Sequence, residues 1–197
     1  GTTGNPIGVV YHHRGGYLMS TGSVTAWNMP NRLNFLYTVP MFHCNGWCYP
    51  WTLAMLHARV ICIRNIRAKE IFELISEHKI THFGGAPIIL NMLANTPKEE
   101  QIKLNHKVYV LTAAAPPPSI IFKKMKELGF EVMHVYGLTE TYGHILQCAW
   151  NSVWDELSED EKADISSRQG VRYPNTEDVK VMNPENMKTV PNDGKTI

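Results

Sequence analysis

The chain has 197 residues, of which 44% are hydrophobic and 19% are charged. This composition is typical of a folded globular protein and excludes an intrinsically disordered one. With 19 basic and 18 acidic residues the net charge is +1, so the sequence predicts no nucleic-acid partner.

An uncharged run covers residues 33–58, a length that a membrane span would need. Because Pro40, Pro50 and several polar residues interrupt it, we expect a buried strand, a loop and a core helix, and no transmembrane segment. The cysteines lack metal-type spacing, so we predict reduced, buried thiols and a cytoplasmic or organelle-matrix location. They are Cys44, Cys48, Cys62 and Cys148.

The chain opens with a loop rich in glycine and threonine, residues 1–8. Glycine permits positive φ and close approach of the backbone to a ligand, so such a loop can wrap an anion with its amide groups. A plain flexible turn is the alternative. Residues 15–27 predict a helix, with His13 as its cap, and the pair His12 and His13 indicates a strand-to-helix corner rather than a metal site.

Strands and helices then alternate about every 20 to 27 residues. Apolar and β-branched runs predict strands at 34–39, 59–63, 80–83, 107–111 and 131–135, and helical spacing predicts helices at 49–57, 68–78, 87–94 and 119–128. This alternation is typical of an α/β fold with a layered, mainly parallel sheet and flanking helices.

The regularity weakens towards the C-terminus. Residues 144–150 predict a further strand, and residues 156–167 predict an exposed helix opened by a capping box of Ser158 and Glu161. A last strand is predicted at 178–182.

Residues 136–141, Tyr-Gly-Leu-Thr-Glu-Thr, directly follow a predicted buried strand. Ligands of open α/β sheets bind beyond the carboxyl ends of the strands. Together with the loop at residues 1–8, about 130 residues earlier, this segment resembles the signatures of the adenylate-forming (AMP-binding) superfamily. That superfamily includes acyl-CoA synthetases, peptide-synthetase adenylation domains and luciferases.

The resemblance covers nearly the whole chain. It implies that residues 1–197 are part of the large N-terminal domain of an adenylate-forming enzyme, truncated at both ends and without the C-terminal lid domain. We therefore expect a piece of a longer protein that does not turn over substrate by itself.

The resemblance also implies the ligands ATP, Mg²⁺ and coenzyme A. Thr139 would bond the α-phosphate, and Glu140 would hold the magnesium ion. The β- and γ-phosphates would lie in the N-terminal loop, against Gly1, Thr2, Thr3 and Gly4. Adenine would lie in a slot between the Ala113–Ala115 segment and Tyr136, and Gly137 would also contact the nucleotide. Taken alone, Glu140 is also consistent with an ordinary exposed acid in a loop. The alternative for Ala113, Ala114 and Ala115 is a tight loop without a role in binding.

Two departures from the family pattern stand out. Alanines occupy the adenine segment where the family often has glycine, which narrows the slot. Ile7 stands where the family commonly has lysine, so an ammonium group that would assist phosphate binding is missing, unless a neighbour such as Arg14 replaces it.

His43 and Trp47 lie in a segment that borders the acyl pocket in the family, so the resemblance assigns them, with Ala114, to the carboxylic acid. Core packing is the alternative for both. The implied parent is an acyl-CoA synthetase, resembling ligases for short- and medium-chain fatty acids or methylthiopropionate. An adenylation domain with another acceptor, such as a carrier protein, and a degenerate nucleotide-binding module remain alternatives.

Overall fold

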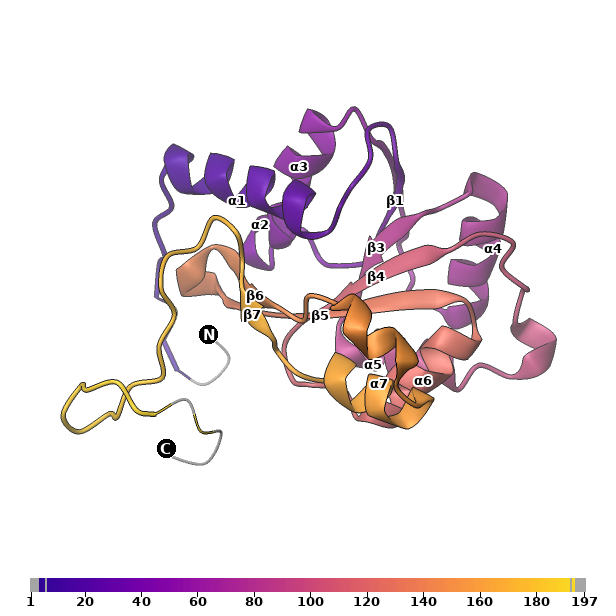
Figure 1. Cartoon of the computed structure of the whole chain (residues 1–197). Coiled ribbons are helices and arrows are strands. Elements are labelled where there is room, and N and C mark those ends of the chain that lie inside the picture. The colour runs from indigo at the N-terminus through magenta and orange to yellow at the C-terminus, as the bar shows by residue number, and fades with distance from the viewer. Residues whose placement is uncertain (1–3, 6, 192, 194–197) are drawn as a thin grey trace.

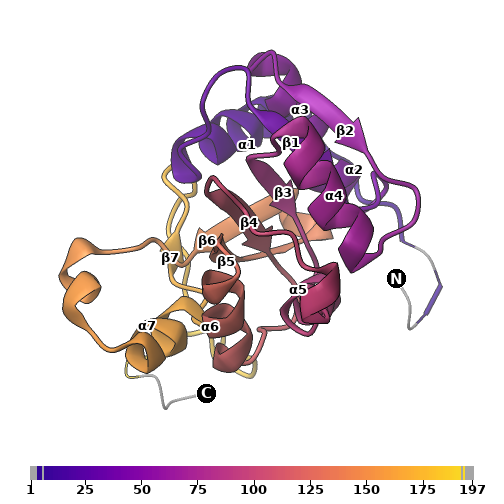
Figure 2. The same ribbon diagram turned by 90° about the vertical axis from the view of Figure 1, so that its right-hand side faces the viewer.

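The computed structural model describes residues 4, 5, 7–191 and 193 of the chain. Within these residues, seven strands form one sheet in the order β2-β1-β3-β4-β5-β6-β7; Figure 2 labels each of them, and Figure 1 shows the same ribbon from another side. The strands are β1 (Asn34–Tyr37), β2 (Arg59–Cys62), β3 (His82–Gly84), β4 (Val108–Thr112), β5 (Phe130–Leu138), β6 (Gly143–Gln147) and β7 (Val171–Arg172).

Strands β1 to β5 are all parallel, whereas β6 pairs antiparallel with both β5 and β7. Parallel strands need long crossover connections, and helices supply them here. The helices are α1 (His13–Ala26), α2 (Cys44–Trp47), α3 (Tyr49–Met55), α4 (Ala68–His78), α5 (Pro87–Ala94), α6 (Ser119–Glu127) and α7 (Glu159–Ser166). The predicted fold class, a mainly parallel α/β sheet with flanking helices, is confirmed.

The sheet separates two apolar cores. Side chains alternate along a strand, so Phe35 and Tyr37 of β1 enter one core while Leu36 enters the other. The first core lies under α1 and α3 and the second under α4, α5 and α6. Figure 2 shows α4, α5 and α6 together on one side of the sheet and α1 and α3 on the other.

Most predicted elements agree with the structure. The helix α4 has the bounds that its apolar spacing predicts, and the capping box of Ser158 and Glu161 opens α7. The cap of α1 is a correction: the N-cap is His12, whose Nδ1 accepts the Gly15 N–H at 2.7 Å. His13 is the first residue of the helix instead.

Three predictions about the C-terminal half were wrong, and one strand there was missed. Strand β5 continues to Leu138, so Tyr136 and Gly137 lie within it rather than beyond it. Helix α7 begins only at Glu159, because Ser152–Glu156 forms a separate 3-10 helix. Residues 178–182 form no strand beyond one isolated bridge, and the short strand β7 was not predicted.

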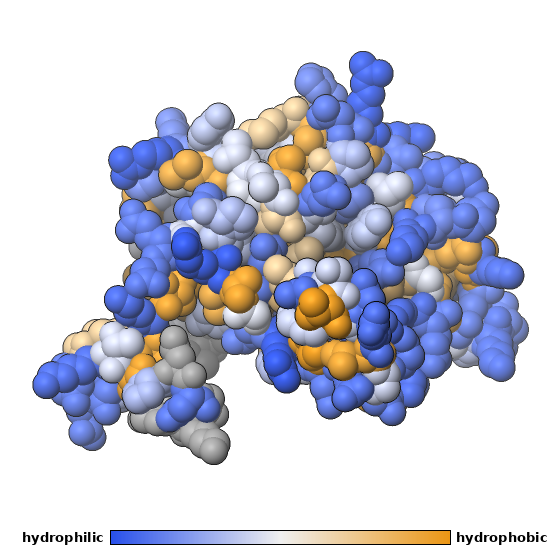
Figure 3. Space-filling model, viewed as in Figure 1, coloured by the Kyte–Doolittle hydropathy of each residue, from blue (hydrophilic) through white to orange (hydrophobic). Residues whose placement is uncertain are grey.

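No helix in the described residues is long and apolar enough to cross a bilayer. Figure 3 shows a surface that is polar over most of one face, with apolar residues in separate small groups. All four cysteines are free, but the prediction that they are buried is correct only for Cys48, since Cys62 is exposed and the other two are partly buried.

Candidate active site

Thr139 and Glu140 lie in η2 (Thr139–Thr141), a 3-10 turn that joins β5 to β6. Thr141 holds this turn together, because its hydroxyl accepts the Leu138 N–H at 2.9 Å and lies 2.9 Å from the Gly143 carbonyl oxygen. Thr139 and Glu140 are both exposed. The turn therefore presents a hydroxyl and a carboxylate to solvent at the carboxyl end of a central strand, where ligands of such sheets bind.

Gly137 permits the close pairing that sets this turn. The β5–β6 register shifts between Tyr136 and Gly137, which pairs with His144. A side chain at position 137 would collide with the carbonyl group of Gly143. The glycine is thus required by packing, whatever its part in ligand binding.

The segment that follows the N-terminal loop lies against the same turn. The Tyr11 hydroxyl donates to the Thr139 carbonyl oxygen at 2.7 Å, and the Tyr11 and Tyr142 ring centroids are 3.9 Å apart. Burial, followed by the neighbouring Cys44 and other acidic groups including Glu140, raises the pKa of Tyr11 to about 12. These contacts place Tyr11, three residues after the N-terminal loop, against the turn that carries the second motif.

The segment with His43 also contacts this turn. Cys44 Sγ lies 3.5 Å from Thr139 Oγ1, and His43, one residue earlier, is exposed at the same rim with its ring 4.5 Å from that of Phe42. His43 and Thr139 are therefore brought near each other, through Cys44.

The backbone of this segment is unusual. Left-handed φ values of 41° to 64° run through five consecutive residues, Cys44, Asn45, Gly46, Trp47 and Cys48. Only Gly46 adopts such values without a steric cost, and left-handed backbone costs other residues roughly 1–2 kcal/mol each. The Gly46 carbonyl oxygen accepts a hydrogen bond from the Tyr37 hydroxyl at 2.8 Å, which fixes α2 to the end of β1.

Trp47 extends inward from this rim. Its indole packs where a side chain on Gly84 would lie, about 3.1 Å from that position, so Gly84 at the end of β3 makes room for it. The indole also meets the His144 ring edge-on, with ring centroids 5.1 Å apart. Trp47 is half-buried and His144 is 2% exposed, so depth increases from His43 through Trp47 to His144.

The predicted adenine slot lies at neighbouring strand ends. The register pairs Thr112 of β4 with His134 of β5, which places the Ala113–Ala115 segment and Tyr136 at the same edge. Ala113 is buried, whereas Ala114 and Ala115 are exposed. Ala114 has a φ of 79°, a value that glycine adopts readily and alanine does not, which gives a physical reason for glycine in related chains.

The N-terminal loop is only partly described. Gly1, Thr2 and Thr3 lie outside the described residues, so their predicted phosphate contacts remain predictions. Gly4 is exposed, as is Ile7, whose exposed fraction is 85%. Because the Ile7 side chain is so exposed, packing does not explain why an isoleucine occupies this position.

For magnesium, the turn offers one protein carboxylate. The described part of the chain contains no group of three or more His, Cys, Asp or Glu side chains that would hold a metal by themselves. Magnesium commonly takes one or two carboxylates plus substrate phosphates and water. The exposed Glu140 fits that donor set once a nucleotide lies beside it.

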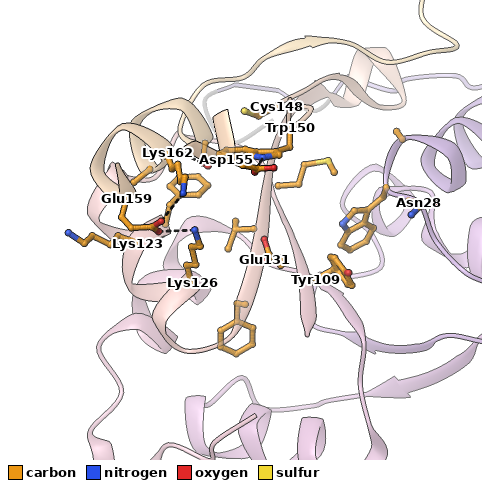
Figure 4. A pocket seen from close by; sticks show the side chains of 18 residues that line it. Asn28, Tyr109, Lys123, Lys126, Glu131, Cys148, Trp150, Asp155, Glu159 and Lys162 are labelled. Carbon is orange, nitrogen blue, oxygen red and sulfur yellow. Dashed lines mark hydrogen bonds and ion pairs between the residues drawn. The ribbon is translucent and has the colours of Figure 1, made fainter. Parts of the chain in front are cut away.

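Two cavities are lined by none of the residues that the sequence predicts for the site. One of about 560 Å³ adjoins the turn and is lined by residues of α1 and α3 together with Tyr11, His12, Asn45 and Tyr142. The other, about 370 Å³, lies between β5, α6 and α7, beside the Lys126–Glu159–Lys162 ion pairs (Figure 4). Its walls contain none of the motif residues, so we place the site at the turn and not there.

Tyr11, Cys44 and His144 were not predicted as site residues. No sequence pattern marks Tyr11, a tyrosine after a glycine loop, or Cys44, a cysteine in an apolar run, as a site residue. His144 directly follows the Tyr-Gly-Leu-Thr-Glu-Thr-Tyr-Gly segment. A histidine within a predicted strand next to this motif was the one feature that could have marked it as a site residue.

The family model of AMP-binding enzymes matches residues 1–196. The chain belongs to this AMP-binding enzyme family. It is 50% identical over its whole length to an acetate/butyrate–CoA ligase of Arabidopsis thaliana, AAE7, and 43% identical to a 2-methylpropanoate–CoA ligase of Humulus lupulus, CCL4. The chain spans 35% of the length of each of these relatives.

Solved structures agree on the fold. An o-succinylbenzoate coenzyme A synthetase of Bacillus subtilis, determined with ATP and magnesium ion, matches 97% of this AMP-binding chain with a TM-score of 0.79. The match covers 37% of that protein at 20% sequence identity, which supports the shared fold.

Proposed function

We propose that the full-length protein is an acyl-CoA synthetase, which uses ATP to convert a carboxylic acid first to an acyl-adenylate and then to a coenzyme A thioester. The observation that carries this proposal is the convergence on Thr139: Tyr11 bonds its carbonyl oxygen and Cys44 contacts its hydroxyl. Tyr11, which follows the loop resembling the phosphate loop, and Cys44, which lies in the acyl segment, therefore both contact the turn that carries the Thr-Glu signature. Family membership and the names of the relatives support the same activity.

In the first step a carboxylate oxygen of the acid bonds to the α-phosphorus, and the bond from that phosphorus to the bridging oxygen of the β-phosphate breaks. Pyrophosphate leaves with the bond electrons. Negative charge grows on the phosphoryl oxygens in the transition state, so donors aimed at them accelerate the reaction. The exposed Thr139 hydroxyl is our candidate donor, and Gly1, Thr2, Thr3 and Gly4 are the candidates for the outer phosphates.

Glu140 is the proposed magnesium ligand. Bound beside the triphosphate, the ion would neutralise its charge, and Glu140 would fix the ion to the turn. Ala113, Ala114 and Ala115 would form one wall of the adenine slot and Tyr136 the other, with Gly137 also contacting the nucleotide.

In the second step the coenzyme A thiol loses its proton to solvent and its sulfur bonds to the acyl carbon, while the bond from that carbon to the phosphate oxygen breaks and AMP leaves with the bond electrons. His43 and Trp47 are the proposed wall of the acid site, with Ala114 beside them. Because His43 is exposed at the rim and Trp47 reaches inward, His43 would lie near the reacting carboxyl group and Trp47 along the chain of the acid.

We also propose short- or medium-chain acids as substrates, on the strength of the relatives named for acetate, butyrate and 2-methylpropanoate. A reducing compartment, cytoplasm or an organelle matrix, is proposed from the free cysteines. The 197-residue chain would be part of the adenylation domain of this enzyme, and we expect it to be inactive without the remainder.

The test is thioester formation by the purified full-length protein. It is incubated with ATP, Mg²⁺, coenzyme A and single acids from two to ten carbons, and products are quantified by mass spectrometry. The proposal predicts acyl-CoA and AMP in equal amounts for at least one acid. Acid-dependent pyrophosphate exchange without thioester would indicate another acceptor, and nucleotide binding without exchange would indicate a degenerate module; either result contradicts the proposal.

A further inference from the structure

Three fully buried side chains lie behind Trp47 with polar atoms that have no hydrogen-bond partner. His144 is 2% exposed, Tyr49 is 1% and Tyr173 is 0%. Both ring nitrogens of His144 and the hydroxyl groups of Tyr49 and Tyr173 are unpartnered. Buried polar groups are nearly always paired, so each such atom calls for an explanation.

The three side chains form one cluster. The His144 and Tyr173 ring centroids are 6.2 Å apart, and Tyr173 and Tyr49 belong to the same core. The fully buried Cys48 connects Trp47 to Tyr49 and lies 3.3 Å from the place of a side chain on Gly143. We call His144, Tyr49 and Tyr173 the inner polar cluster.

The cluster adjoins the proposed acid site. His144 pairs directly with Gly137 of the signature across β5 and β6, and its ring contacts Trp47. Burial lowers the pKa of His144 to about 3, so near neutral pH the imidazole is uncharged. An uncharged imidazole offers one donor and one acceptor, and each phenol offers a donor and an acceptor.

We propose that the inner polar cluster binds a hydrogen-bonding group at the far end of the substrate, so that the preferred acids carry a hydroxyl or carbonyl oxygen distal to the carboxylate. This inference rests on the proposed function, because it takes His43 and Trp47 as the outer part of the acid site. A methyl group placed against the cluster leaves all four polar atoms unsatisfied, whereas a hydroxyl group can pair with up to three of them and a carbonyl oxygen with two. Sites built to bond a substrate hydroxyl discriminate strongly against analogues that lack it.

Matched pairs of acids test the proposal on the full-length protein. Each pair exchanges a terminal methyl for a hydroxyl at equal heavy-atom count: butanoate with 3-hydroxypropanoate, pentanoate with 4-hydroxybutanoate, and hexanoate with 5-hydroxypentanoate. The measured quantity is the ratio of kcat/KM for the hydroxy acid to that for its alkyl partner. Because both values come from one preparation, a loss of folded protein cancels in the ratio.

The proposal predicts a ratio above one for at least one pair in the parent protein. We expect that ratio to fall at least tenfold in His144→Phe and by a smaller factor in Tyr173→Phe, which removes only the hydroxyl. The matched control is His82→Phe, since His82 is equally buried on β3 but bonds Thr81 and contacts no proposed site residue. Its ratio should equal that of the parent.

Ratios at or below one for every pair, or a ratio that survives both Tyr173→Phe and His144→Phe, would overturn the polar subsite while leaving the ligase proposal intact. Should His144→Phe fail to fold, Tyr173→Phe alone decides. The absence of thioester from every acid would instead overturn the proposed function, and the subsite with it.

Discussion

Thr139 and Glu140 are exposed residues that the turn holds in place without using their side chains in its own hydrogen bonds. Replacing Thr139 by valine or Glu140 by glutamine should therefore leave folding nearly unchanged and lower acid-dependent pyrophosphate exchange by about 100-fold or more, the usual cost of a lost transition-state contact. Glu156→Gln is the matched control, since Glu156 is also an exposed acid in a 3-10 helix. Exchange rates within threefold of the parent in both variants would remove these residues from the mechanism.

Ile7 is the residue whose replacement should improve the enzyme. An ammonium group beside a triphosphate gains a charge-assisted hydrogen bond worth about 1.5–3 kcal/mol, so Ile7→Lys should lower the KM for ATP about tenfold. Val10→Lys adds the same charge to a side chain that is 94% exposed, and controls for long-range attraction. An equal effect of both lysines would show that general charge, and not position 7, is responsible.

Residue types alone identify some of these positions and not others. The Thr-Glu pair and the glycine loop are recognisable because several matching residues stand together. His144, Tyr49 and Tyr173 are not, because a buried histidine and two core tyrosines fit ordinary packing and only the structure shows their polar atoms without partners.

Among the elements, α2 is the one whose backbone departs most from ordinary geometry. Asn45 has a φ of 48° and is exposed, and a β-branched residue is a steric outlier there. We expect Asn45→Val to lower the free energy of unfolding by roughly 1–2 kcal/mol, and Asn45→Gly to be close to neutral. Chemical denaturation of both variants measures this, and equal stabilities would contradict the left-handed turn.

The prediction of elements succeeded where local signals dominate. Helix α4 has strong apolar periodicity, and α7 has a capping box, so both are specified by neighbouring residues. The extent of β5 was not predicted, because its last residues are held by antiparallel pairing with β6, a contact that no local pattern shows. The same holds for β7, which exists only through its pairing with β6.

At the scale of the whole molecule, two buried histidines make stability depend on pH. Burial lowers the pKa of His144 to about 3 and that of His82 to about 4. As the pH falls below about 6.5, the unfolded chain takes up protons that the folded chain does not, so stability decreases. Each histidine contributes up to about 1.4 kcal/mol per pH unit in this range.

Denaturant unfolding of the full-length protein between pH 7 and pH 5 measures this dependence. The slope of unfolding free energy against pH should be smaller in His144→Phe than in the parent by up to about 1.4 kcal/mol per unit. His82→Phe should reduce it in the same way. An unchanged slope in both variants would mean that neither histidine is kept uncharged by the fold.

The order of the sheet brings the distant segments together. Strands β4 and β5 are adjacent and parallel, so the alanine segment and the Tyr-Gly pair meet at one edge, and Tyr11 joins the N-terminal segment to that edge through Thr139. The sequence predicts this edge from the strand–helix alternation. The contacts of Tyr11 and Cys44 depend on three-dimensional packing, and only the structure provides them.

The position of a bound nucleotide tests the central claim most directly. A crystal structure of the full-length protein with Mg²⁺ and a non-hydrolysable ATP analogue should show adenine between Ala114 and Tyr136, the α-phosphate beside Thr139 and the metal ion on Glu140. A nucleotide found in the cavity between α6 and α7, or anywhere away from Thr139, would contradict the account.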